Sequence, residues 1–139
     1  MVTHVLDASA ILRYLDGEAG SERVKVILKE HLAGKSRVAV SAVHWGEVAG
    51  IVRKRHGAAG MGVALSRLSA FGIEVVPVTG ERAVNSAVIK QDRKIPYADA
   101  FGVDLAGDSP EHVLVTADFD VKPAKQDVRI EFLPLKAKP

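Results

Sequence analysis

The sequence contains no cysteine, and only 5% of its 139 residues are aromatic. The absence of cysteine excludes disulfides, thiolate metal sites and cysteine nucleophiles. Because aromatic side chains are scarce, the core must consist mainly of Val, Leu, Ile and Ala, and we expect no base-stacking platform for single-stranded nucleic acid. No apolar run approaches the roughly 18 residues that a membrane-spanning helix needs. We therefore expect no membrane partner.

Neither sign of charge dominates, since 19 basic and 17 acidic residues give a net charge of +2. This balance permits a phosphate-bearing partner where positive charges cluster, but does not by itself indicate one. The N-terminal apolar run meets Asp7 after a few residues, which is too short for a signal peptide, and we expect a cytoplasmic protein. The length and the 47% hydrophobic content fit one domain over residues 1–139.

Short apolar runs alternate with amphipathic segments along the chain. The predicted strands cover residues 2–6, 38–40, 73–76, 113–115 and 128–132. The predicted helices cover residues 8–15, 42–54, 63–71, 81–91 and 96–106, and a further helix is capped by Ser21 and stops at Gly34. Residues 57–62 are predicted to form a flexible break. This alternation predicts an α/β sandwich with a mainly parallel sheet, in which ligands bind beyond the carboxyl ends of the strands.

Two aspartates follow predicted strands at that edge of the sheet. Asp7 ends the first strand, and Asp118 comes shortly after the strand 113–115. Each also has an ordinary structural role open to it, Asp7 as the N-cap of a helix and Asp118 as a turn residue. Taken singly, neither position favours a functional role over the structural one.

Glu47 and Asp99 lie on predicted helices. Glu47 shares a stripe with Val43 and Ile51, at i, i+4 and i+8, which predicts a partly buried carboxylate that needs a cation. The alternative is that the helix is rotated and Glu47 points to water. Asp99 lies in the first turn after Pro96, where the helix dipole alone favours an acid and where the side chain also points towards a ligand.

Four carboxylates at one edge of a sheet repel one another unless a cation compensates. Mg²⁺ prefers carboxylate and water ligands in octahedral geometry, so a hard divalent ion fits this set. The histidines show no metal-ligand spacing, and we expect them to be ordinary surface or core residues: His4, His31, His44, His56 and His112.

Four segments resemble, in order and spacing, the PIN-domain ribonucleases, and specifically the VapC-type toxins of toxin–antitoxin pairs. They read VLDASAIL at 5–12, SAVHWGEV at 41–48, IPYADAF at 95–101 and VLVTADFD at 113–120. The resemblance covers essentially the whole chain. It implies a PIN-like three-layer sandwich and Mg²⁺- or Mn²⁺-dependent cleavage of RNA to 5′-phosphate and 3′-hydroxyl ends. It also implies a cognate antitoxin partner and a homodimer.

The same resemblance gives the acidic residues their roles. It implies that the catalytic and metal-binding acids are Asp7, Glu47, Asp99 and Asp118, with Asp120 as a further metal ligand. Asp7, Asp99 and Asp118 are then the direct or water-mediated ligands, whereas Glu47 binds a second metal or orients the attacking water. Ser9 and Thr116 fall at polar positions that support the site.

The chain departs from the family pattern in the helix after Pro96. Asp104 and Asp108 make this stretch more acidic than expected, and Gly102 is a poor helix former. These departures bear on the length of that helix and not on the acid set.

Substrate contacts and two other classes of function stay open. Seven basic residues are candidates for phosphate contacts, although a solvated helix end explains the run 53–56 better: Arg13, Arg53, Lys54, Arg55, Lys90, Arg93 and Lys94. A phosphate-transfer protein could use Asp7 as its nucleophile, but Ser9 stands where a dehalogenase-like enzyme has a second acid. A degenerate PIN-like module could act only by binding protein partners through apolar helix faces such as residues 24–32.

Overall fold

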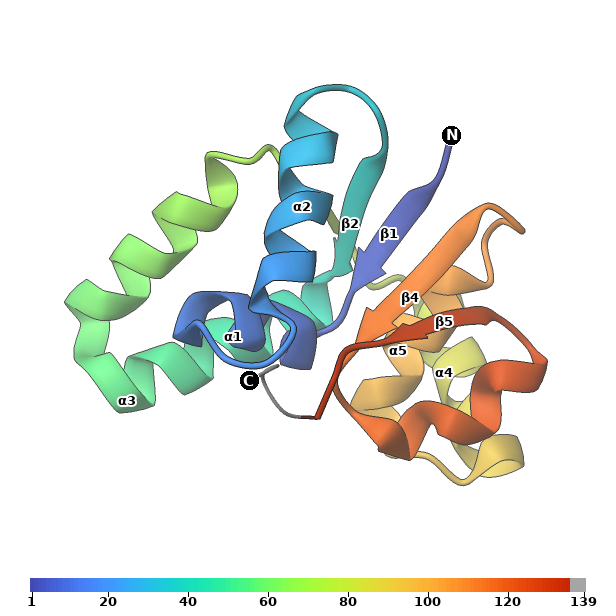
Figure 1. Cartoon of the computed structure of the whole chain (residues 1–139). Helices are drawn as coiled ribbons and strands as arrows, with labels where there is room; N and C mark the ends of the chain where they lie inside the picture. Colours follow the sequence, from blue (N-terminus) through green and yellow to red (C-terminus); the bar gives the residue numbers. More distant parts are fainter. Residues whose placement is uncertain (136–139) are drawn as a thin grey trace.

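A central parallel sheet dominates the structure, a computed structural model that describes residues 1–135. Five strands lie in the order β3-β2-β1-β4-β5, and all neighbouring pairs are parallel. The strands are β1 (Thr3–Leu6), β2 (Arg37–Ser41), β3 (Glu74–Val76), β4 (His112–Thr116) and β5 (Arg129–Phe132). Figure 1 shows helices on both faces of this sheet.

The strand order reverses between β1 and β4. From β1 the chain adds β2 and β3 on one side, and it later returns to add β4 and β5 on the other side. In open parallel sheets a ligand-binding crevice forms beyond the carboxyl ends of the strands at such a reversal. Asp7 directly follows β1, and Asp118 follows β4 with only Ala117 between them. The topology therefore places both aspartates at the point where a ligand is expected.

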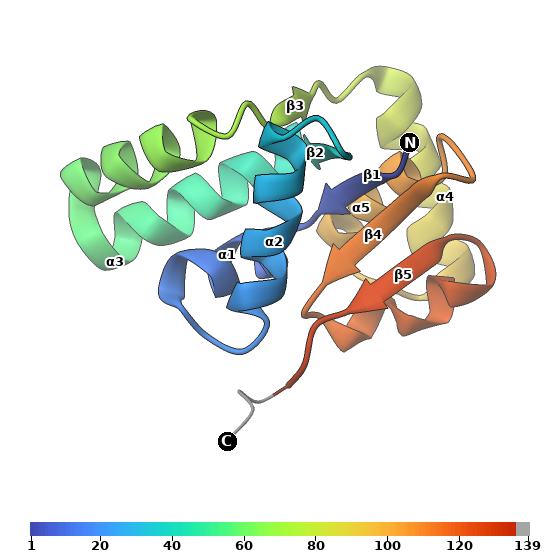
Figure 2. The same cartoon turned by 45° about the horizontal axis from the view of Figure 1, so that its top comes forward.

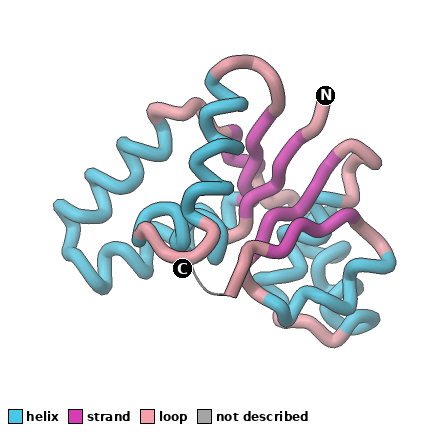
Figure 3. The backbone as a smooth tube through the Cα atoms, in the orientation of Figure 1, coloured by secondary structure: helices cyan, strands magenta, loops and turns pink. Residues whose placement is uncertain are grey.

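Two helical layers cover the sheet, as the tube in Figure 3 also shows. One layer holds α1 (Ala8–Asp16), α2 (Ser21–Leu32) and α3 (Ala42–Ser69), and the other holds α4 (Gly80–Arg93), α5 (Tyr97–Ala106) and the 3₁₀ helix η1 (Phe119–Gln126). Neighbouring strand residues serve different cores, since Leu6 and Val115 belong to the first and Val5 and Leu114 to the second. Alternate side chains of a strand point to opposite faces, so continuous apolar runs supply both cores. The predicted three-layer α/β sandwich is confirmed.

The helix α3 differs from its prediction, because the break expected over residues 57–62 is confined to Gly57. Gly57 has φ 74° and ψ −179°, a conformation that essentially only glycine adopts. The helix resumes at once, and the glycines at 60 and 62 are helical. Figure 2 shows the two legs of α3 turning back on each other and extending to one side of the sheet.

Replacing Gly57 with Ala is expected to lower the free energy of unfolding by about 1–3 kcal/mol, because a Cβ strains this backbone conformation. Gly62→Ala is the matched control. Gly62 is helical and exposed, and a Cβ built there meets nothing within 4 Å. The control is expected to stabilise the fold by about 0.5–1 kcal/mol. Urea unfolding followed by circular dichroism measures both, and shifts of the same sign would contradict this account of the bend.

One further local prediction was wrong, and one short helix was not predicted. The residue that caps α2 is Gly20 rather than Ser21; its φ is 89°, and a Cβ there would lie 2.9 Å from the Cβ of Leu133. Close approach and a left-handed backbone both require glycine at this position. The helix η1 was not predicted, because Pro123 and its polar neighbours hide any helical period. Within residues 1–135, no helix has both the length and the apolar character that crossing a membrane requires.

Candidate metal centre

Three aspartates converge at the carboxyl edge of the sheet. Asp99, Asp118 and Asp120 each offer a carboxylate oxygen, and these oxygens lie within 4.8 Å of one another. Asp99 lies in the first turn of α5, while Asp118 caps η1 by accepting a 2.9 Å hydrogen bond from the Asp120 backbone N–H. The short 3₁₀ helix therefore brings Asp120, predicted only as a further ligand, into the same cluster as Asp99 and Asp118.

Asp7 is buried beside this cluster and has a structural role as well. Its Oδ1 accepts hydrogen bonds from the Ala10 backbone N–H at 3.0 Å and from the Ser9 hydroxyl at 2.6 Å. Its Oδ2 accepts a hydrogen bond from the Thr116 hydroxyl. The predicted N-cap of α1 is thus present, and it holds the carboxylate in place at the end of β1.

The hydroxyls of Ser9 and Thr116 connect Asp7 to the loop that carries Asp118. Thr116 Oγ1 accepts a 2.9 Å hydrogen bond from the Asp118 backbone N–H, and Ser9 Oγ accepts one of 2.8 Å from the Ala117 backbone N–H. Each hydroxyl donates to Asp7 and accepts from the β4 loop. The network therefore fixes the end of β1 relative to the end of β4, across the reversal of strand order.

Glu47 lies at the edge of the site, and the prediction that it is partly buried was wrong. Its side chain is 41% exposed, because His44, Val48 and Val52 turn towards the protein interior while Glu47 lies beside that stripe. Its Oε1 is 3.8 Å from His44 Nε2, and its charge contributes to raising the pKa of Asp99. Glu47 thus belongs to the same acidic region, but burial does not force it to bind a cation.

The carboxylates shift one another's pKa values. Burial, then the close approach of Asp118, then the charges of Asp7 and Glu47 raise the pKa of Asp99 to about 7. Burial also raises the pKa of Asp7, although its three hydrogen bonds oppose the shift. Such a set is unfavourable without a positive charge, and its donors are all carboxylate oxygens. Hard divalent ions such as Mg²⁺ or Mn²⁺ match both properties.

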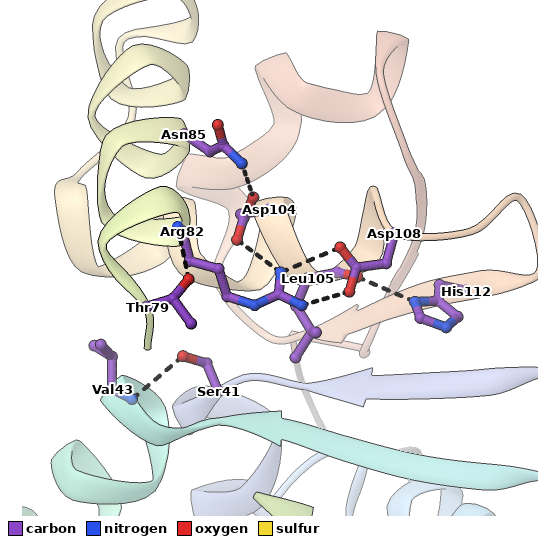
Figure 4. Close-up of polar contacts among 9 residues, drawn as sticks. All are labelled: Ser41, Val43, Thr79, Arg82, Asn85, Asp104, Leu105, Asp108 and His112. Carbon is purple, nitrogen blue, oxygen red and sulfur yellow. Dashed lines mark hydrogen bonds and ion pairs between the residues drawn. The ribbon is translucent and has the colours of Figure 1, made fainter. Parts of the chain in front are cut away.

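Asp104 of α5 and Asp108, two residues beyond its end, bind Arg82 of α4, as Figure 4 shows. Neither belongs to the acidic cluster. Asp104 is buried, and it accepts hydrogen bonds from Arg82 Nη1 at 3.0 Å and from Asn85 Nδ2 at 3.2 Å. Asp108 accepts two more from the same guanidinium, at 3.1 and 2.6 Å. The role of Asp104, which the sequence left open, is therefore structural.

Gly102 does not shorten α5, which runs without interruption from Tyr97 to Ala106. A Cβ at this position would lie 3.1 Å from Leu114 Cδ1 and 3.2 Å from His44 Cε1. The missing side chain therefore lets α5 approach the sheet and the start of α3 closely.

Three of the seven basic candidates already bind protein groups. Arg13 Nη1 donates to the carbonyls of Ala19 and Pro134, at 2.9 and 3.2 Å. Arg55 pairs with Asp16 at 3.1 Å, and Arg93 forms a two-bond pair with Asp127. Four others are exposed, namely Arg53, Lys54, Lys90 and Lys94. A hollow of about 230 Å³ has Ser9 and Ala117 in its wall together with Leu12, Arg13, Asp16, Glu18 and Arg55, so it adjoins the acidic site.

The profile of the PIN domain family matches residues 4–125, and the chain belongs to this family. The family that the four sequence segments indicated is confirmed. A comparison with curated proteins found no match.

Solved structures share the fold at low sequence identity. The chain is similar to one in the DNA-bound VapBC from Salmonella typhimurium, with a TM-score of 0.70 and 16% identity over 95% of this chain and 98% of that one. It is also similar to a chain of VapBC2 from Rickettsia felis bound to a promoter DNA fragment, with a TM-score of 0.68 and 14% identity over 96% and 100%. A chain of VapBC-1 from nontypeable Haemophilus influenzae is similar as well, with a TM-score of 0.63 and 16% identity over 94% of this chain and 98% of that one.

Proposed function

We propose that the chain is a metal-dependent endoribonuclease, the toxin of a toxin–antitoxin pair, acting as a single PIN domain with Mg²⁺ or Mn²⁺. The observation that carries this proposal is the convergence of Asp99, Asp118 and Asp120 within 4.8 Å in a chain of the PIN-domain family. The position of Asp7 and Asp118 at the reversal of strand order supports it.

In this proposal the ion is held by Asp99, Asp118 and Asp120. Asp7 contributes its charge directly or through a water, and it anchors the site through Thr116. When bound, the ion lowers the pKa of a coordinated water and neutralises charge on the phosphate oxygens. Glu47 is exposed at the rim, where its carboxylate can orient the attacking water or take up its proton.

The family and the similar solved structures support the partners that we propose. The three similar structures are of VapBC, and two of them are bound to DNA. By analogy we extend to this chain a cognate antitoxin as protein partner. RNA as substrate, assembly as a homodimer and a place in the cytoplasm belong to the same proposal.

Cleavage of 5′-labelled single-stranded RNA tests the proposal directly. We expect the purified chain to cleave RNA with Mg²⁺ or Mn²⁺, to stop when EDTA is added, and to recover when the ion is restored. The products are expected to carry 5′-phosphate and 3′-hydroxyl ends. Asp118→Asn, purified in parallel, controls for contaminating nucleases. Cleavage that persists in EDTA, or that Asp118→Asn retains in full, contradicts the proposal.

Two other hypotheses, a phosphate-transfer protein that uses Asp7 and a module that only binds protein, can be distinguished from the proposed nuclease. The buried Asp7 has both carboxylate oxygens engaged in hydrogen bonds, which disfavours its use as a phosphate-accepting nucleophile. A module that acts only by binding protein would show no affinity for Mn²⁺ and no cleavage under the conditions above.

A further inference from the structure

His44 is fully enclosed, at 1% exposure, yet it makes a specific polar contact. Its Nε2 lies 2.8 Å from the backbone carbonyl of Ala98. Because a carbonyl oxygen only accepts, Nε2 must carry the proton. Nδ1 is buried without a hydrogen-bond partner among the described residues. Burying Nδ1 without a partner costs free energy, and an apolar side chain of similar size would avoid that cost. What histidine provides here, and an apolar side chain would not, is the hydrogen bond to Ala98.

This bond connects the two elements that carry Glu47 and Asp99. His44 lies in the first turn of α3, three residues before Glu47, and Ala98 directly precedes Asp99 in the first turn of α5. The two helices belong to opposite layers of the sandwich. The His44–Ala98 bond therefore links the layers next to the acidic site. The same Nε2 lies 3.8 Å from Glu47 Oε1, so one ring nitrogen faces both the carboxylate and the carbonyl.

Gly102 restricts the position of the imidazole ring from the other side. It lies one turn after Ala98 on α5, and a Cβ there would approach His44 Cε1 to 3.2 Å. The ring is thus in contact with α5 at two successive turns. Closely packed interiors transmit displacements of this kind, so a shift of the ring moves the start of α5 relative to α3.

We infer that His44 is a positioning residue: through its bond to Ala98 it sets the place of Asp99, one of the three carboxylates proposed to hold the ion, and thereby the affinity of the acidic site for a divalent ion. The inference rests on the proposed function, since it gives that site its ion. Residues that orient metal ligands in this way contribute about 10–100-fold to metal affinity or activity. This role could not be predicted from the sequence, because the spacing of the histidines indicates only that they are not a ligand set.

The test compares Mn²⁺ binding to the full chain and its variants by titration calorimetry. His44→Leu removes the donor and keeps an apolar filling, and we expect it to weaken Mn²⁺ binding about 10-fold. His44→Gln keeps an N–H at a similar reach, and we expect it to recover most of that loss. His112→Leu is the matched control, because His112 Nδ1 is 3.0 Å from the Leu105 carbonyl at the far end of α5. The control is expected to lower the melting temperature while leaving Mn²⁺ affinity unchanged.

Each outcome bears on the inference. If His44→Leu binds Mn²⁺ as tightly as the wild type does, the inference is wrong. It is also wrong if His44→Gln loses as much Mn²⁺ affinity as His44→Leu, because the effect would then come from the packing of the ring and not from its N–H. If His44→Leu does not fold, Gly102→Ala carries the test, because the added methyl displaces the ring; unchanged Mn²⁺ affinity in that folded variant overturns the inference. A wild-type chain without Mn²⁺ affinity, alone or with RNA, overturns the proposed function and this inference together. Wild-type binding with no effect of the variants overturns only the role of His44.

Discussion

An Asp99→Asn variant is expected to lose RNA cleavage by about 1000-fold or more while the metal-free protein becomes more stable. Asp99 is one of three converging carboxylates, and its pKa is raised to about 7, chiefly by burial and then by Asp118. The folded chain therefore binds this proton more tightly than the unfolded chain does. Stability then falls as pH rises from the ordinary value of 3.8 towards 7, and the full penalty is present above pH 7. Asparagine removes the charge and hence the penalty.

Urea unfolding in EDTA at pH 8 and at pH 4 measures the stability part of this prediction. The gain from Asp99→Asn is expected to be about 1 kcal/mol at pH 8, less than the pKa difference alone implies because solvent screens this half-buried carboxylate, and close to zero at pH 4. Added Mg²⁺ should reverse the order at pH 8, because an ion that binds only the folded wild type stabilises it. Asp92→Asn, an exposed position on α4, is the control and is expected to change neither cleavage nor the pH dependence. Undiminished cleavage by Asp99→Asn, or a loss of stability in EDTA at pH 8, would contradict the account.

The sequence located the acidic region better than it described each acid. Asp7 and Asp118 could be placed because they follow strands, and the crevice rule depends only on topology. Glu47 was predicted from its apolar stripe, yet the stripe that faces the interior is His44, Val48 and Val52, and Glu47 is 41% exposed. A shift of a few tens of degrees about a helix axis separates these outcomes, and no local pattern determines it. The closeness of Asp120 depends on η1, which has no periodic signal.

An Arg82→Met variant is expected to lower the free energy of unfolding by about 3 kcal/mol. The guanidinium donates hydrogen bonds to Asp104 of α5 and to Asp108 just beyond it, and these bonds, above all those to Asp108, raise the pKa of Arg82 (Figure 4). The side chain of Asp104 is only 7% exposed. Removing its partner leaves a buried charge with only the Asn85 amide to compensate it, which is far more costly than losing a surface pair.

Arg93→Met is the matched control, because Arg93 makes the same two-bond contact with Asp127 at the surface. The side chains of that pair are 31% and 39% exposed, and its loss is expected to destabilise the protein far less than the loss of the Arg82 contacts, because solvent screens an exposed pair. Thermal unfolding of the two variants in the same buffer gives the comparison. Equal destabilisation would show that burial of Asp104 is not what matters. Since the Arg82 contacts lie outside the acidic site, folded Arg82→Met is expected to bind Mn²⁺ like the wild type.

The contacts that hold the layers together were the least accessible to sequence analysis. The strands and most helices were predicted, because apolar runs and helical periods are local signals. Asp104 was noticed only as an unexpected acid, whereas its partner Arg82 lies 22 positions earlier on another helix. His44 and Ala98 are 54 positions apart. Such pairs become neighbours only when α4, α5 and α3 take their places on the sheet.

The most direct test of the central claim is anomalous diffraction from crystals of the chain grown with Mn²⁺. The account predicts a strong anomalous peak coordinated by carboxylate oxygens of Asp99, Asp118 and Asp120, and no such peak in Asp118→Asn crystals grown in parallel. A peak at other residues, or an acidic site that binds no Mn²⁺ under conditions where the protein cleaves RNA, would contradict it.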